Sequence, residues 1–333
     1  MEIAKAVVIA TTAPHDTPWP SMRSAPKALV PVANRPLIFH DLDQLSAAGV
    51  LETAIAVEPA GSAAMRSAIG DGSRWRMDVR FVECGPAPTL AQVLGGAKGF
   101  IGREPVLVQH AGSLLRDRIH GHITAFAGER LDALALRLPG ALELDPYDND
   151  GALDGSLLLS ERAIAILAAD EARADPLRRV REGGGQVRVQ EVDGCLPCLG
   201  PQELLLEANR RMLEALVPSI PHDSVMDSRV QGPVVIHPTA HVERSLVRGP
   251  AVIGPRARVV DAYGGPSTSI GADVVVEGAE VEYSIVLPGA RLAFVGTRIQ
   301  ESIIGRDATV RRTLEPPAAL RMAVGDGAEV VLS

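Results

Sequence analysis

The sequence predicts a Rossmann-like α/β domain with a mostly parallel sheet, followed by a solenoid of stacked coils. Strand-like and helix-like segments alternate through the first half, and an aliphatic residue recurs every 17 positions in the second half. One amphipathic segment lies between the halves. Alternating strands and helices form βαβ units and a parallel sheet, whereas a short fixed repeat is typical of a solenoid.

The first half can be followed element by element. Short apolar runs at 5–10, 53–59, 77–83 and 105–110 predict buried parallel strands. Apolar residues at helical spacing predict helices over 36–50, 63–70 and 89–102. Residues 155–172 indicate a strand and then a helix, and 183–194 an edge strand. Ligands of such sheets bind at the carboxyl ends of the strands, so the loop after the first strand is the expected site.

A helix over 201–216 is predicted to connect the two halves. One face of it is apolar and comprises Leu204, Leu205, Ala208, Met212, Leu213 and Leu216. We expect an α/β domain over 1–200, a helical connector over 201–228 and a solenoid domain over 229–333.

The solenoid repeat holds in two registers. The leading aliphatic residues are Ile236, Ile253, Ile270, Leu287 and Ile304, and six positions after them come Val242, Val259, Val276, Ala293 and Val310. Ile-Gly starts and the six-residue sub-period resemble hexapeptide repeats, which form a left-handed parallel β-helix. An ordinary β-sandwich is the alternative.

Composition excludes several classes of protein. The chain has 46% hydrophobic and 22% charged residues, as soluble globular proteins do, and its net charge of −8 argues against general nucleic-acid binding. No apolar run could span a membrane, and the start "MEIAKAVVIA" has no signal-peptide pattern. The three cysteines are too few for a disulfide framework. We therefore expect a cytoplasmic protein.

Four stretches carry a family signature: "PKALVPVANRPLIF" (26–39), "IGDGSRWRMDVRFV" (69–82), "TLAQVL" (89–94) and "VEYSIVLPGA" (281–290) with the tail "RMAVGDGAEVVLS". They resemble the sugar-1-phosphate nucleotidyltransferases, most strongly the long actinobacterial glucose-1-phosphate thymidylyltransferases. The resemblance covers nearly the whole chain. It implies that a sugar-phosphate oxygen attacks the α-phosphorus of a nucleoside triphosphate and expels pyrophosphate, with Mg²⁺ held by two aspartates.

The sequence departs from this family at its catalytic positions. A glycine-rich loop with an arginine is expected where "TTAPHDTPW" (11–19) stands, and prolines there remove backbone donors. By the resemblance, Ala111 and Cys198 occupy the positions of the two metal aspartates. A Mg²⁺ site of the usual kind is therefore not expected, and we expect no cofactor.

The residues that could still bind a ligand are a short set. The resemblance assigns Lys27 to the phosphate region and Gln92 to base contact, and it matches Gly155 to a sugar-side glycine. As alternatives, Lys27 could be a solvated cation and Gln92 an ordinary helix residue. Arg23 could substitute for the loop arginine. The candidate ligand-binding residues are Thr11, Thr12, Arg23, Lys27, Gln92, His110 and Gly155; no catalytic residue is assigned.

Other patterns have ordinary explanations beside chemical ones. Cys195 and Cys198 form a C-x-x-C that suggests zinc or redox chemistry, but no second ligand pair follows. His120 and His122 could bind a metal or simply be solvated. An acidic loop with Asp145, Asp148, Asp150 and Asp154 lacks calcium-loop spacing. His237 and His241 could act as the base of a β-helix acyltransferase.

These observations favour a degenerate nucleotidyltransferase homologue, a pseudoenzyme that is inactive in ordinary Mg²⁺-dependent transfer. We expect it to bind a nucleotide or sugar phosphate, or to regulate an active paralogue, as a homo-oligomer or hetero-oligomer; specialised metabolism is one setting for such a role. No nucleic acid or membrane is expected as a partner. The alternatives are an active nucleotidyltransferase with a rebuilt site, a different reaction in the same cleft, and β-helix acyl transfer.

Overall fold

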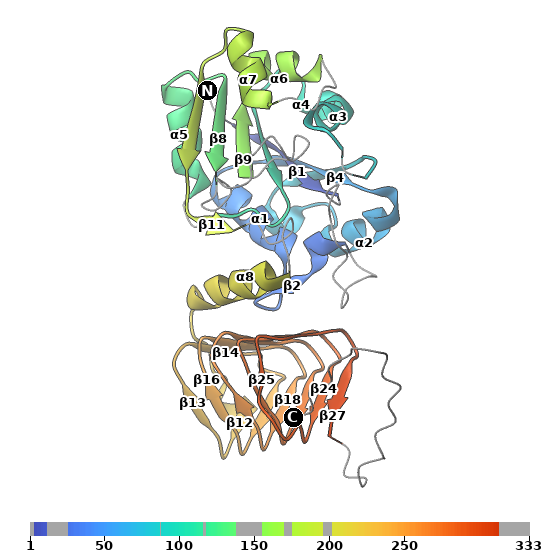
Figure 1. Ribbon diagram of the computed structural model, residues 1–333, viewed down its shortest axis with the longest axis vertical. Helices are drawn as coiled ribbons and strands as arrows, with labels where there is room; N and C mark the ends of the chain where they lie inside the picture. The colour runs from blue at the N-terminus through green and yellow to red at the C-terminus, as the bar shows by residue number, and fades with distance from the viewer. Residues whose placement is uncertain are drawn as a thin grey trace, which may run out of the picture.

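The computed structural model describes residues 3–11, 26–86, 88–115, 118–137, 155–169, 175–195 and 202–312. Within them, a sheet domain and a solenoid follow one another along the chain, with one long helix lying between them (Figure 1). None of the helices in these ranges is long and apolar enough to cross a membrane.

The N-terminal part is built on a seven-stranded sheet. Its strand order is β10-β8-β9-β6-β1-β4-β5, and every neighbouring pair is parallel except the two pairs that involve β9. The predicted strands are confirmed, and β10 lies at an edge of the sheet as expected, whereas β8 was not predicted from the sequence. The strands are β1 (Lys5–Ala10), β4 (Glu52–Val57), β5 (Asp78–Glu83), β6 (Val106–His110), β8 (Ala133–Arg137), β9 (Gly155–Leu159) and β10 (Val187–Glu191).

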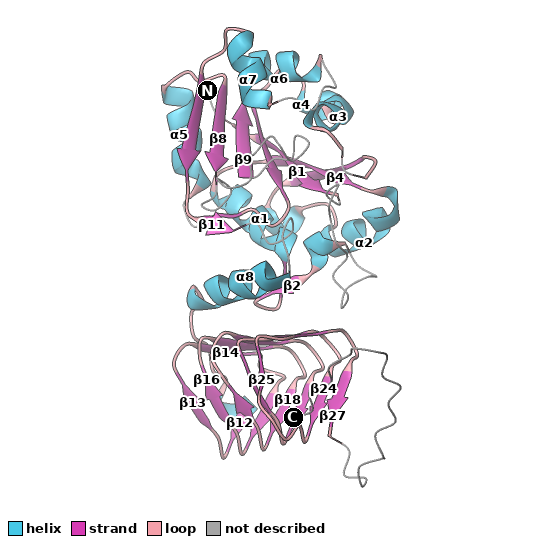
Figure 2. Cartoon of the chain, in the orientation of Figure 1, coloured by secondary structure: helices cyan, strands magenta, loops and turns pink. Residues whose placement is uncertain are grey.

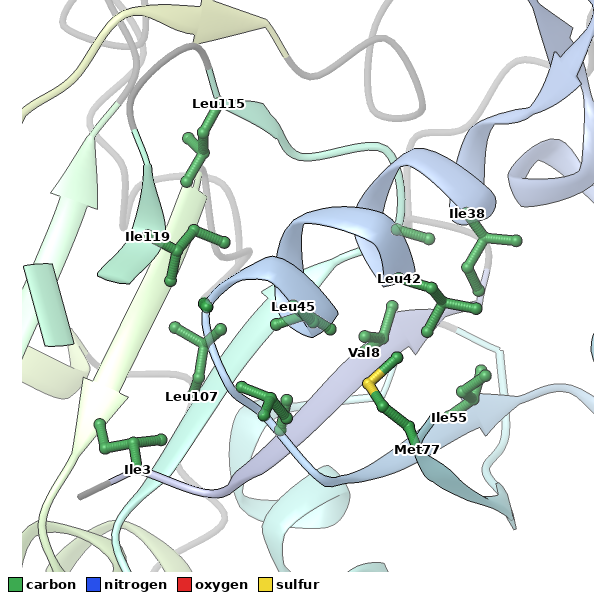
Figure 3. Close-up of a cluster of buried hydrophobic side chains, with 14 of the residues drawn as sticks. Ile3, Val8, Ile38, Leu42, Leu45, Ile55, Met77, Leu107, Leu115 and Ile119 are labelled. Carbon is green, nitrogen blue, oxygen red and sulfur yellow. The ribbon is translucent and has the colours of Figure 1, made fainter. Parts of the chain in front are cut away.

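Helices cover both faces of this sheet because its buried strands are apolar on both sides. Along β1, Val8 belongs to one core and Val7 to the other. The first core includes side chains of α1 (Leu37–Ala47), α2 (Pro59–Ile69) and α5 (Ile119–Gly128), and Figure 3 shows several of them around Val8. The second core includes side chains of α3 (Leu90–Gly96), α4 (Lys98–Ile101), α6 (Glu161–Ala168) and α7 (Pro176–Glu182).

The C-terminal part is a left-handed β-helix of three parallel sheets. One sheet comprises β12 (Val225–Met226), β15 (His241–Glu243), β18 (Arg258–Val260), β21 (Val275–Glu277), β24 (Arg291–Ala293) and β27 (Thr309–Arg311). The second comprises β13 (Arg229–Gln231), β16 (Leu246–Arg248), β19 (Tyr263–Gly264), β22 (Glu280–Glu282) and β25 (Ile299–Gln300). The third comprises β14 (Val234–Ile236), β17 (Ala251–Ile253), β20 (Thr268–Ile270), β23 (Ile285–Val286) and β26 (Ile303–Ile304).

The coil register corrects two residues of the predicted repeat. Ile270 pairs with Val286, which in turn pairs with Ile304, so Leu287 is not a member of this ladder. Leu287 instead lies in a buried cluster with residues of the connector helix, at the interface between the two parts. In the second register Leu292, rather than Ala293, pairs with both Val276 and Val310. One coil is therefore one residue shorter and the next one longer than the 17-residue period.

The connector helix α8 (Gln202–Glu214) lies between the sheet domain and the β-helix (Figure 2). Leu205, Ala208 and Leu213 are fully buried there, as the apolar face predicts. Leu204 is 38% exposed, so its assignment to the buried face is wrong: the contact face runs through Leu205 and Ala208 instead.

A short hairpin of the sheet domain completes this interface. Strands β2 (Pro31–Val32) and β3 (Arg35–Pro36) are joined by Ala33 and Asn34, which both have left-handed backbone conformations. The Asn34 side chain donates a 2.6 Å hydrogen bond to the Ile270 carbonyl on β20. The segment that follows the expected phosphate loop is therefore attached directly to the β-helix.

Candidate functional site

Three of the predicted ligand-binding residues lie at one edge of the sheet, on adjacent strands. Thr11 follows the last residue of β1, and His110 ends β6, where it pairs with Ile9. Strand β9 runs antiparallel to β6 and pairs Ser156 with Gln109, so Gly155 lies at the level of His110. The carboxyl ends of β1 and β6 and the amino end of β9 thus form one edge, where open α/β sheets bind their ligands.

Lys27 begins a short 3₁₀ helix, η1 (Lys27–Leu29), near the same edge. The preceding Pro26 contacts the first turn of α2, because a Cβ built on Gly61 would lie 2.9 Å from the Pro26 Cγ. Helix α2 starts directly after β4, at the carboxyl end of that strand. Lys27 is half-buried and already takes part in an interaction within the protein.

Gln92 has a clear structural role at the start of α3. The Thr89 hydroxyl accepts a hydrogen bond from the Gln92 backbone N–H at 3.2 Å, and the Gln92 side-chain oxygen accepts one from the Thr89 N–H at 3.0 Å. This reciprocal capping box satisfies two helix donors. The side chain is therefore engaged in holding the helix, although the residue remains exposed.

Gly155 is required by close packing at the start of β9. A Cβ at this position would collide with the Leu136 carbonyl oxygen of the neighbouring strand β8. Packing alone therefore explains a glycine here, and no ligand has to be invoked.

Neither His110 nor Ala111 brings a charge to this edge of the sheet at neutral pH. Desolvation lowers the pKa of His110 to about 4, so its imidazole is uncharged at neutral pH and acts as a hydrogen-bonding group. Ala111 is buried, and its N–H donates a 2.8 Å hydrogen bond to the Ile9 carbonyl. In the described ranges no three His, Cys, Asp or Glu side chains are grouped to hold a metal.

Several predicted residues lie outside the part of the chain that the structure describes. They are Thr12, Arg23, Cys198 and the acidic loop with Asp145, Asp148, Asp150 and Asp154. Of the C-x-x-C pattern, only Cys195 is described, as part of β11 (Gly194–Cys195), which pairs with β7 (Leu114–Leu115).

The predicted histidine groups are dispersed. His120 is exposed and His122 buried on α5, so the two rings do not share a face. On the β-helix the His237 Nδ1 lies 2.9 Å from the Thr239 hydroxyl, and the His241 Nε2 lies 2.9 Å from a Glu243 carboxylate oxygen. Glu243 also forms an ion pair with Arg244, so its charge is shared.

A buried polar network beneath the site was not predicted from the sequence. Asp41 of α1 has no exposed surface, and its carboxylate accepts hydrogen bonds from the Gly112 N–H at 2.6 Å and the Gln109 side-chain amide at 3.2 Å. The Ser156 hydroxyl donates to the Gln109 oxygen at 3.4 Å. The one available signal was an aspartate on the helix face otherwise occupied by Leu37, Ile38, Leu42 and Leu45.

Comparison with known proteins identifies the family. The chain is 31% identical to a glucose-1-phosphate thymidylyltransferase of Streptomyces griseus over 94% of this chain and 96% of that protein. The chain belongs to the sugar-1-phosphate nucleotidyltransferase family. It is also 26% identical to the low-salt glycan biosynthesis nucleotidyltransferase Agl11 of Haloferax volcanii, over 94% of this chain and 96% of that protein.

Solved structures support the same fold. A putative glucose-1-phosphate thymidylyltransferase from Bacillus anthracis, solved in complex with a sucrose, superposes with a TM-score of 0.54 at 16% identity and covers 65% of this chain and 97% of that one. No protein-family model matches the chain. The 31% identity to the Streptomyces griseus protein confirms the family resemblance predicted from four sequence stretches.

One of the stretches that resemble the family forms a tight turn before β5. In Gly70-Asp71-Gly72-Ser73, the Asp71 carboxylate accepts a 2.9 Å hydrogen bond from the Ser73 N–H, which lowers the pKa of Asp71. Gly72 has a left-handed φ of +87°, and a Cβ there would collide with Val79. This turn precedes β5 and lies at the amino end of that strand, opposite the candidate site.

Proposed function

We propose that this nucleotidyltransferase homologue does not catalyse ordinary Mg²⁺-dependent nucleotidyl transfer. The observation that carries the proposal is Ala111, a buried methyl side chain at the carboxyl end of β6. The family resemblance places a metal-binding aspartate there. An alanine offers no oxygen ligand to Mg²⁺, and the lost metal is worth several kcal/mol of transition-state stabilisation.

The charge next to Ala111 supports the same proposal. Phosphoryl and nucleotidyl transfer needs fixed positive charge around the departing pyrophosphate. Because the lowered pKa keeps His110 neutral, this residue supplies no cation at neutral pH. His110 would therefore offer a hydrogen bond to a ligand and no charge to the departing pyrophosphate.

We propose that this edge of the sheet instead binds a nucleotide or a sugar phosphate. Lys27 supplies a cation on η1 near the edge where β1, β4 and β6 end. Thr11 and His110 add hydrogen-bonding groups on neighbouring strands. A ligand held there would give the protein a sensing or regulatory role, alone or in an oligomer with an active paralogue.

Thermal-shift measurements test this binding. The purified chain would be titrated with nucleoside triphosphates, nucleoside diphosphate sugars and sugar 1-phosphates, each with and without Mg²⁺. A ligand that binds only the native state raises the melting temperature, and the rise grows with the ratio of ligand concentration to Kd. We expect a shift that does not require Mg²⁺. The absence of a shift with every ligand would contradict ligand binding and leave assembly as the role.

An active enzyme with a rebuilt site is the second candidate. It is favoured by the 31% identity to the Streptomyces griseus thymidylyltransferase across nearly both chains. Release of pyrophosphate from a nucleoside triphosphate and a sugar 1-phosphate would establish this second candidate.

A further inference from the structure

A carboxyl group without any exposed surface lies beneath the candidate site. Asp41 is on the buried face of α1, and each of its two oxygens faces a different donor: Oδ1 faces the Gln109 amide nitrogen and Oδ2 the Gly112 N–H. A buried carboxylate is costly unless hydrogen bonds or a cation offset its desolvation. Here a backbone N–H and a side-chain amide offset part of that cost.

Within the described residues, the hydrogen bonds to the Asp41 carboxyl group come from Gln109, Gly112 and Ser113, which are all uncharged. His40 bonds to the Val32 carbonyl and Asp43 pairs with Arg35. Burial raises the pKa of Asp41 to about 8, while hydrogen bonds from Gly112 and Ser113 partly oppose this shift. The groups on elements packed against α1 are Lys27 on η1, Arg35 on β3, Arg74 on the 3₁₀ helix η2 (Ser73–Trp75), His40 and Asp43 on α1 itself, His110 on β6, and His120 and His122 on α5.

The neighbouring amide can adapt to either form of the carboxyl group. When Asp41 is ionised, the Gln109 NH₂ donates to Oδ1, and the Gln109 oxygen accepts from the Ser156 hydroxyl. When Asp41 is neutral, a proton on Oδ1 needs an acceptor. A half-turn of the Gln109 amide brings its oxygen to Oδ1 and its NH₂ to the Ser156 Oγ, because the two ends of an amide have the same shape. The Gly112 N–H keeps its acceptor Oδ2 in both arrangements.

We propose that Asp41, Gln109 and Ser156 form a buried proton switch with two hydrogen-bonded arrangements, related by rotation of the Gln109 amide. The switch acts on both segments that border the candidate site. Asp41 holds the turn after β6 through Gly112, and Ser156 follows Gly155 at the start of β9. Uptake of one proton by Asp41 reverses the direction of the Asp41–Gln109 and Gln109–Ser156 hydrogen bonds, while the bond from Gly112 is kept. The inference does not depend on which ligand the candidate site binds.

The switch can be observed in the protein without a ligand. The side-chain amide signals of Gln109, recorded by NMR in the deuterated full-length chain, would be followed between about pH 5 and pH 10. In the wild type we expect them to move between two positions with a single midpoint. In the variant Asp41→Asn, the new NH₂ donates to the Gln109 oxygen and the new oxygen accepts from Gly112, so the signals should stay at the low-pH position throughout.

A matched control comes from the same helix. Asp43→Asn removes an aspartate that lies two residues away and is 42% exposed, and its Gln109 signals should titrate as in the wild type. Gln109 signals that do not change with pH in the wild type would overturn the proposal, and so would an Asp41→Asn variant that titrates normally. Because the wild-type titration is decisive by itself, poor folding of a variant would not remove the test.

Discussion

The side-chain oxygen of Asn209 on the connector helix accepts a 2.9 Å hydrogen bond from the backbone N–H of Ala33 in the hairpin of the sheet domain. The same oxygen accepts a 2.6 Å bond from the Ser269 hydroxyl, and the Asn209 amide donates a 3.1 Å bond to the Ser267 carbonyl of the β-helix. A single buried side chain thus joins the connector, the sheet domain and the β-helix.

Replacing this residue should weaken the whole chain. Asn209→Leu keeps the volume but leaves the Ala33 N–H, the Ser269 hydroxyl and the Ser267 carbonyl without their partner, which costs about 2–4 kcal/mol of unfolding free energy. Chemical denaturation measures this loss. As a control on the same helix, Arg210→Ala removes partly exposed ion pairs with Glu207 and Glu214 and should cost less than about 1 kcal/mol. Equal effects of both substitutions would contradict the role of Asn209.

Stability should depend on pH through Asp41. Its pKa rises from the ordinary aspartate value of 3.8 to about 8 in the native protein, so the native state binds this proton more tightly than the unfolded state. The contribution is fully present below about pH 4 and is lost as pH rises toward 8, with a slope of up to about 1.4 kcal/mol per pH unit.

The Asp41→Asn variant isolates this effect. Its unfolding free energy, relative to that of the wild type, should increase steadily between about pH 5 and pH 8. Denaturation curves at several pH values give the difference directly. A difference that stays constant with pH would show that Asp41 has an ordinary pKa in the native state.

Lys27 should matter for ligand binding and not for folding alone. Lys27→Ala removes the cation of η1, and we expect the ligand-induced thermal shift to fall to less than about half, because an ion pair with phosphate is lost. Lys98→Ala on α4 removes an exposed lysine elsewhere and should leave the shift unchanged. The same shift in both variants would place the ligand away from Lys27.

Replacement of Gly155 or of Gly95 by alanine should change the unfolding free energy in opposite directions. Gly155→Ala introduces a Cβ into the Leu136 carbonyl and should lower the unfolding free energy by at least about 2 kcal/mol. Gly95→Ala lies within α3 with no atom within 4 Å of the new Cβ, so it should stabilise the chain by about 0.5–1 kcal/mol. Denaturant midpoints compare the two. A Gly155→Ala variant as stable as the wild type would show that β9 can move away from β8.

The alternation of short apolar runs with helical spacing was sufficient to predict β1, β4, β5 and β6 and the helical segments between them, although the single helix expected over 89–102 is two helices, α3 and α4. Those signals are local: β1, β4 and β6 are short runs of buried residues, and each helix carries its own apolar stripe. The coil repeat was also predicted, but Leu287 was placed inside the β-helix although it packs outward against the connector. An aliphatic residue at an interface has the same sequence signature as one in a core.

The candidate site was less predictable because its chemistry depends on distant partners. Asp41 and Gln109 are 68 residues apart, and a single aspartate on a helix is more often solvated than buried. Asn209 and Ala33 are 176 residues apart. Gln92 and Gly155 matched family positions that contact a ligand. In the structure, Gln92 caps the start of α3, and Gly155 allows β9 to pack closely against β8.

Pyrophosphate release tests the central claim most directly. The purified chain would be incubated with nucleoside triphosphates, sugar 1-phosphates and Mg²⁺, beside an active thymidylyltransferase as the positive control. With Ala111 at the expected metal position and a neutral His110 next to it, we predict no release above the enzyme-free background. Release at a rate comparable to that of the active enzyme would contradict the proposed loss of nucleotidyl transfer.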